Sequence, residues 1–174
     1  MNSTRKYEFV LSVYPYTRGL AFVLFEGAFA PVDWGVHEAR GAHKNEQCLK
    51  RVGKLLAQHT PDVLVLQDMS ESGTRRARRI RDLNGAISEL AEMYAMHVHA
   101  YSRADVRDCF AELGITTKFG IAETIAKHIP VFDQYLPPIR KPWMSEDARM
   151  GLFDATALAL TFFKNMAGDQ QEAA

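Results

Sequence analysis

The sequence has little cysteine, no net charge and no long apolar run, and each shortage narrows what the chain can be. Its two cysteines, Cys48 and Cys109, form no Cys-x-x-Cys pair, so neither a disulfide framework nor a structural zinc site is expected. No run of about 18 apolar residues occurs, and the N-terminal residues lack the apolar centre of a signal peptide. We therefore expect a cytoplasmic protein with no membrane association.

Charge is balanced, with 21 basic and 21 acidic residues. The total field of the protein would not attract nucleic acid, so any such binding must come from a local patch. The contents of hydrophobic residues (47%) and charged residues (24%) are ordinary for a globular protein. A length of 174 residues fits one domain over the whole chain, with a frayed tail expected at residues 167–174.

Hydrophobic periodicity divides the chain into alternating strands and helices. Pro15 lacks an N–H donor and is expected to separate the first two strands. Four of the seven prolines lie in residues 129–144, which predicts a loop there. The expected strands are 7–13, 19–25, 32–36, 63–66 and 96–101, and the expected helices are 44–59, 74–94, 103–113, 117–128 and 145–166.

This order of elements predicts an α/β protein whose five-stranded mixed sheet begins with an antiparallel meander and is flanked by helices. It is the order of the ribonuclease-H-like fold, and the local sequence resembles the RuvC-like Holliday-junction resolvases within that fold. Residues 10–15 with Gly19 are similar to the family's first strand, which ends in Asp-Pro-Gly. Residues 61–67 are similar to the strand that ends in its catalytic Glu.

Two further segments carry the resemblance. Arg107 and Lys118 match two basic positions that contact DNA in the family, and residues 154–161 resemble its last helix with a catalytic Asp. The four segments span nearly the whole chain with appropriate spacing. The resemblance implies a homodimer, since gripping a four-way DNA junction symmetrically takes two copies.

Most of the family's acidic residues are replaced. The resemblance implies two Mg²⁺ ions held by converging carboxylates, but those positions hold Tyr14, Gln67 and Gly151, and only Asp154 matches. A neutral phenol and a neutral amide do not replace two anions beside two divalent cations. Asp154 is the only charged residue between Gly151 and Phe163, so it is either a site residue or a structural carboxylate.

Relocated carboxylates are the alternative. Asp68 follows Gln67 and could join Asp154 as a metal ligand if the strand has ended there. Asp147 lies seven residues before Asp154, which places both on one face of the expected last helix. Asp154, Asp68 and Asp147 would then be catalytic residues around Mg²⁺ or Mn²⁺.

An arginine-rich run begins the helix expected from residue 74. Arginine binds phosphate bidentately, which favours a phosphate-contacting surface, whereas the alternative is a solvated face paired with acids. The expected nucleic-acid-binding residues are Arg75, Arg76, Arg78, Arg79, Arg107 and Lys118.

Three functions follow from these observations. The first is a RuvC-like domain that binds branched, structured or single-stranded DNA, with weak or absent cleavage and no cofactor. The second is a divergent endonuclease that depends on Mg²⁺ or Mn²⁺, in DNA recombination or repair. The third is a scaffold or dimerisation module that keeps the fold without its ligand.

Overall fold

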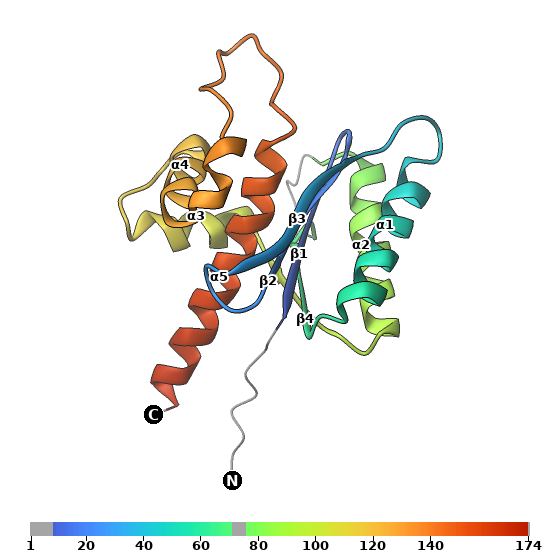
Figure 1. Ribbon diagram of the computed structural model, residues 1–174, viewed down its shortest axis with the longest axis horizontal. Coiled ribbons are helices and arrows are strands. Elements are labelled where there is room, and N and C mark those ends of the chain that lie inside the picture. Colours follow the sequence, from blue (N-terminus) through green and yellow to red (C-terminus); the bar gives the residue numbers. More distant parts are fainter. Residues whose placement is uncertain (1–8, 71–75, 174) are drawn as a thin grey trace.

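The fold is a five-stranded sheet between two layers of helices, as the computed structural model shows for residues 9–70 and 76–173 (Figure 1). The strand order is β3-β2-β1-β4-β5, with β1, β2 and β3 antiparallel and with β4 and β5 parallel to β1. The strands are β1 Val10–Tyr16, β2 Gly19–Phe25, β3 Pro31–Glu38, β4 Val63–Gln67 and β5 His97–Tyr101. The predicted α/β fold class and its initial meander are confirmed.

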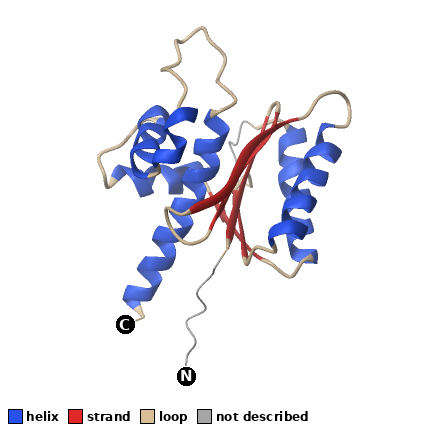
Figure 2. Ribbon diagram, in the orientation of Figure 1, coloured by secondary structure: helices blue, strands red, loops and turns tan. Residues whose placement is uncertain are grey.

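The helices divide between the two faces of the sheet (Figure 2). α1 and α2 cover one face, and α3, α4 and α5 lie on the other. The α-helices are α1 Lys44–His59, α2 Arg78–Met93, α3 Arg103–Ala111, α4 Lys118–His128 and α5 Met150–Glu172, and a short 3₁₀ helix covers Pro130–Tyr135. In the described parts of the chain, no helix is long and apolar enough to cross a membrane.

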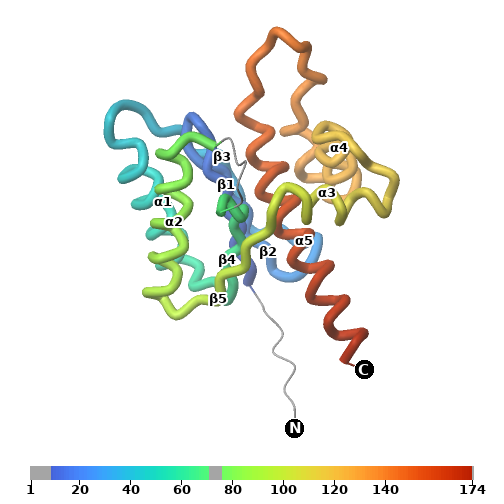
Figure 3. The backbone as a smooth tube through the Cα atoms, turned by 180° about the vertical axis from the view of Figure 1, so that it is seen from behind, coloured from blue at the N-terminus to red at the C-terminus, as the bar shows by residue number. Residues whose placement is uncertain are grey.

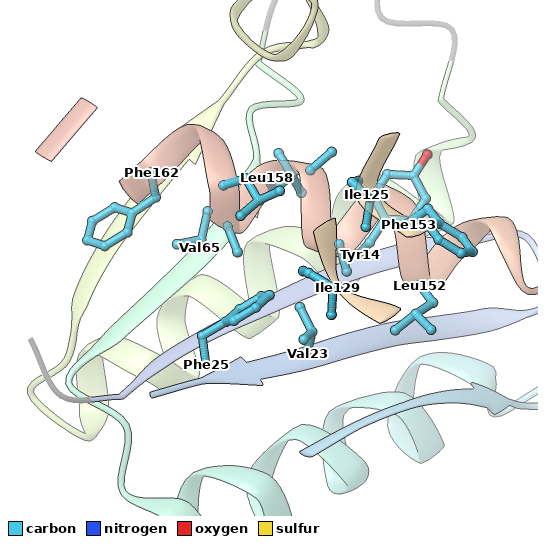
Figure 4. Close-up of a cluster of buried hydrophobic side chains, with 14 of the residues drawn as sticks. Tyr14, Val23, Phe25, Val65, Ile125, Ile129, Leu152, Phe153, Leu158 and Phe162 are labelled. Carbon is cyan, nitrogen blue, oxygen red and sulfur yellow. The ribbon is translucent and has the colours of Figure 1, made fainter. Parts of the chain in front are cut away.

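Successive side chains of β1 point to opposite faces of the sheet and so contribute to both hydrophobic cores. Leu11 and Val13 belong to the cluster under α1 and α2, whereas Val10 and Tyr14 belong to the cluster under α5. The cluster under α5 is the larger one, and Figure 4 shows its side chains packed between the sheet and that helix. α5 is apolar on nearly every side from Met150 to Phe162 because it lies between the sheet and the α3–α4 layer.

Several boundaries differ from the predictions. β1 continues through Pro15 to Tyr16. Its pairing with β4 stops at Ser12, so the missing N–H of Pro15 costs no hydrogen bond on that side. α2 begins at Arg78, and the predicted start at residue 74 lies outside the described residues. The 3₁₀ helix lies within the expected loop.

The last helix also differs at both ends. It begins at Met150 instead of Ser145, and it continues to Glu172, beyond the expected end at Met166. Residues 167–172, where the sequence predicts a tail, are therefore helical. The later start places Asp147 outside the helix.

Candidate nucleic-acid interface

The candidate site lies where β1 and β4 separate. The two parallel strands pair only through residues Val10–Ser12 and Val63–Val65, after which their carboxyl ends diverge. Tyr14 and Gln67 lie beyond the last pair, on neighbouring strands, and both are largely buried. Crevices outside the carboxyl ends of parallel strands are the usual ligand sites of open α/β sheets. The topology therefore brings together the two positions at which the family has carboxylates.

Asp154 brings α5 to the same site. Its side chain is 18% exposed, and its Oδ2 lies 3.1 Å from the Nζ of Lys118. Burial raises the pKa of Asp154 to about 6, against the effect of Lys118, which lowers it. A carboxylate of this kind is expensive to bury, which fits a role in a site better than a role in the core.

Lys118 joins α4 to the site. It is the first residue of α4, after the N-cap Thr117, whose hydroxyl accepts a hydrogen bond from the Gly120 N–H. Its ammonium group pairs with Asp154 and also with Glu146, from the segment before α5. Cations are unfavourable at the positive end of a helix dipole, so this lysine is not placed there for helix stability.

Arg76 fills the space beside the two strand ends. Its guanidinium carbon lies 4.9 Å from the centroid of the Tyr14 ring. Nη2 donates hydrogen bonds to the Tyr14 hydroxyl and, at 3.3 Å, to Oε1 of Gln67. Burial lowers the pKa of Arg76, and Arg103 adds to this effect, while Asp154 and Glu146 oppose it.

A cavity of about 390 Å³ opens beside these groups. Figure 3 shows, from behind, how β5 leads into α3, which lies beside α5. Arg103 and Arg107 of α3 line the cavity together with Lys118, and Arg103, like Lys118, is the first residue of its helix. Among the described residues, three cationic side chains (Arg103, Arg107 and Lys118) and two carboxylates (Glu146 and Asp154) line the cavity, an excess of one positive charge, and Arg76 lies beside it on Tyr14 and Gln67. Such a cavity favours an anion.

The donor set does not suit the two divalent metal ions that the resemblance implies. Tyr14 and Gln67 offer neutral oxygens that already accept hydrogen bonds from Arg76. The remaining carboxylate, Asp154, is paired with an ammonium group. Over residues 9–70 and 76–173, no three His, Cys, Asp or Glu side chains are grouped so that they could hold a metal. Two hard cations require several anionic oxygens, and these side chains do not supply them.

The two proposed relocated ligands, Asp68 and Asp147, form hydrogen bonds with other groups. β4 ends at Gln67, as a role for Asp68 requires, but the Asp68 carboxylate accepts hydrogen bonds from the N–H and hydroxyl of Ser70. These bonds lower the pKa of Asp68. Asp147 precedes α5 and pairs bidentately with Arg149, at 2.9 and 2.7 Å, which lowers the pKa of Asp147. Neither residue lines the cavity beside Asp154.

Gly151 has a packing role. A Cβ atom built on it would lie 3.1 Å from the Cβ of Ala21 and 3.5 Å from the ring of Tyr16. The lack of a side chain therefore lets the first turn of α5 lie directly on β1 and β2. A carboxylate in this place would crowd Ala21, which would have to shift by a few tenths of an ångström.

The arginine run divides between different environments. Of the arginines in this run that the structure describes, Arg76 contacts Tyr14 and Gln67. Arg79 donates to Oδ1 of Asn45 and to the carbonyl oxygen of Thr17, both at 2.9 Å, and so holds α2 to α1 and to the first hairpin. Arg78 is 87% exposed and lies 3.8 Å from Asp82. Arg75 lies outside the described residues.

Sequence reasoning did not single out Arg103 or Glu146. The position of Arg103 could have identified it, because a cation as the first residue of a helix is unfavourable next to the positive end of the helix dipole. Glu146 gives no such signal. Its position depends on how the segment before α5 returns to α4, which no local pattern encodes.

Three solved structures are similar to the chain over most of its length. No protein-family model and no curated protein sequence matches it. RuvC from Thermus thermophilus is 20% identical, with a TM-score of 0.65, over 91% of this chain and 96% of that one. The same protein in complex with a Holliday junction substrate gives 20% identity, a TM-score of 0.68, and coverage of 92% and 96%.

The yeast mitochondrial Holliday junction resolvase Ydc2 is 9% identical, with a TM-score of 0.59, over 91% of this chain and 80% of that one. Each likeness covers 91% or 92% of this chain, so it includes most of the helices and strands described above. The chain therefore has the fold of the RuvC Holliday junction resolvases, with a cationic cavity at the carboxyl ends of β1 and β4.

Proposed function

We propose that this protein binds branched or structured DNA and cuts it slowly or not at all. The observation that carries the proposal is the cavity lined by Arg103, Arg107 and Lys118, on a fold that a Holliday junction complex also has. Arg107 and Lys118 match basic positions of the family, and in this fold they lie on one cavity. Phosphate contacts supply most of the affinity in DNA binding and do not require a particular base sequence.

The proposed surface extends from the cavity to Arg76 and, at the start of α2, to Arg78. Arg75, which the sequence also assigns to this surface, lies outside the described residues. Arg79 is its weakest member, because its guanidinium group already has two acceptors within the protein. The proposal of weak cleavage follows from the donor set, in which Tyr14 and Gln67 replace two carboxylates. No observation favours the scaffold or the divergent nuclease over this function.

Fluorescence anisotropy with a labelled four-way junction tests the proposal. We expect binding whose affinity falls steeply with salt and exceeds the affinity for a linear duplex of equal length. Arg107→Glu should weaken binding by about tenfold or more, since it replaces an attraction to phosphate by a repulsion. Lys127→Glu makes the same change of charge at the far end of α4, outside the cavity, and should have a small effect.

Two results would count against DNA binding. One is no measurable binding at low salt by the unmodified protein. The other is an equal loss in Arg107→Glu and Lys127→Glu, because that would reflect net charge and not the cavity.

A further inference from the structure

Arg76 is held against the two positions where the resemblance implies acidic metal ligands. It contacts Tyr14 through both its ring face and its hydroxyl, and it contacts the side-chain oxygen of Gln67. A guanidinium group in this place needs no anionic partners on the strands. Where the resemblance implies two carboxylates, the chain therefore has the neutral side chains of Tyr14 and Gln67 together with a cation from a different segment.

Lys118 has the corresponding place beside the remaining carboxylate. Its Nζ lies 3.1 Å from Oδ2 of Asp154. The three site positions, Tyr14, Gln67 and Asp154, are thus each in contact with a cationic side chain of the protein. The resemblance implies that metal ions supply the positive charge of this site, whereas in this chain the side chains of Arg76 and Lys118 supply it.

The charge on Arg76 is not neutralised by the groups that bind it. A phenol and an amide are its hydrogen-bond partners, and its buried Nε finds no acceptor within the described residues. Asp154 and Glu146 act on it only through space, and Arg103 opposes them. A partly buried guanidinium with neutral partners keeps its attraction for an anion, and a phosphate group offers it two oxygens in matching geometry.

We propose that Arg76 is a built-in replacement for the divalent metal, so that the site holds a phosphodiester group of DNA without Mg²⁺ and without cleaving it. This inference rests on the proposed function and adds that Arg76 binds the phosphate group in place of a metal ion. Lys118, Arg103 and Arg107 complete the cationic surroundings of the phosphate. Arginine attracts the phosphate oxygens, but it does not generate a hydroxide nucleophile from bound water as a divalent metal does.

The first test compares junction binding in EDTA with binding in Mg²⁺ at matched ionic strength. We expect an affinity in EDTA that is no lower than in Mg²⁺. Arg76→Met should weaken binding by about tenfold or more in both buffers. Arg76→Lys should recover part of the loss, because lysine keeps the charge but not the bidentate geometry.

Arg51→Met is the matched control. Arg51 also places its guanidinium over an aromatic ring, at 5.4 Å from the centroid of Phe22, but it does so from α1 on the other face of the sheet. The same loss of charge and of an arginine–aromatic contact should there leave junction binding nearly unchanged.

The outcomes separate this inference from the proposed function. Binding that requires Mg²⁺, or binding that Arg76→Met leaves intact, would overturn the inference while DNA binding itself stands. No binding by the unmodified protein in either buffer would overturn both.

A second test does not depend on DNA. In Tyr14→Asp/Gln67→Glu, Arg76 should pair with the new carboxylates, and titration calorimetry should detect little Mn²⁺ binding. Adding Arg76→Met should free both carboxylates beside Asp154 and produce measurable Mn²⁺ binding. If the double variant binds Mn²⁺ as tightly as the triple variant, Arg76 does not occupy the place of a metal.

Discussion

Asp154 is largely buried, and its burial disfavours the charged form of the carboxyl group. The pKa of about 6 means that the folded state binds this proton more tightly than the unfolded state does. The contribution of Asp154 to folding stability therefore declines as pH rises from about 4 to about 6, and the cost remains at higher pH.

We predict that Asp154→Asn increases the free energy of unfolding at pH 8 by about 1–2 kcal/mol, because the neutral amide avoids the cost of burying a charge that raises the pKa of Asp154. At pH 4 the variant and the unmodified protein should be nearly equal. Urea denaturation at both pH values measures this. Loss of stability at both pH values would indicate that the carboxylate is instead a structural hydrogen-bonding group.

Asp147→Asn is the matched control for the sign of that effect. Its hydrogen bonds with Arg149 lower the pKa of Asp147, so its charged form stabilises the fold above the unfolded pKa. This substitution should therefore reduce stability at pH 8 and have little effect near pH 3.

Gly151 is a second residue at a position where the resemblance implies a site residue. We predict that Gly151→Asp destabilises the protein by about 3 kcal/mol or more, because the new side chain meets Ala21 and introduces a buried charge. Gly168→Asp, on the same helix with no atom within 4 Å of a new Cβ, should change stability little. Thermal denaturation of both variants measures this difference. Equal midpoint temperatures would mean that α5 can shift away from the sheet with little loss of stability.

The helices α3 and α4 each have a cation as their first residue, a position at which anions stabilise a helix. We predict that Arg103→Ala leaves the free energy of unfolding unchanged or raises it by a few tenths of a kcal/mol, while it weakens junction binding severalfold. Denaturation and anisotropy on the same variant measure the two effects. A parallel loss of stability and binding would assign Arg103 a structural role.

The sequence predicts the helices and strands better than it predicts the contacts of single side chains. Strand-forming runs and helical spacing located the five strands and five α-helices of the described residues, and the bounds of α1 agree residue by residue. The errors lie where tertiary pairing overrides a local preference. Pro15 remains in β1 because β4 has already diverged, and α5 continues past Met166 through Gly168 although glycine often ends a helix.

The site was only partly accessible to sequence reasoning. The positions of Tyr14, Gln67 and Asp154 follow from register on two strands and one helix, so a resemblance over those elements was enough to group them. Contacts made by long side chains across 62 residues, such as Arg76 with Tyr14, leave no periodic pattern. The same holds for Asp147, whose pairing with Arg149 depends on the non-helical segment before α5.

For the molecule as a whole, we predict a homodimer. A four-way junction has two-fold related arms, and a two-fold dimer presents two copies of the Arg107 cavity to them. Multi-angle light scattering at high micromolar concentration should give twice the chain mass of 19.6 kDa. A monomer mass throughout the concentration range would remove the symmetric mode of junction binding.

The charge distribution of the whole site leads to the last prediction: in Mg²⁺ or Mn²⁺, under conditions in which a RuvC resolvase cuts a four-way junction readily, this protein should cut it slowly or not at all. Two carboxylates are replaced by Tyr14 and Gln67, and the third, Asp154, is bound by Lys118. Without closely held metal ions, neither the attacking water nor the leaving oxygen is stabilised, and uncatalysed phosphodiester hydrolysis is extremely slow. Gel assays on labelled junctions, with the resolvase as positive control, measure the rate. Fast metal-dependent cleavage that Asp154→Asn abolishes would instead establish a nuclease built on other ligands, and Asp68 and Asp147 would be the first residues to substitute.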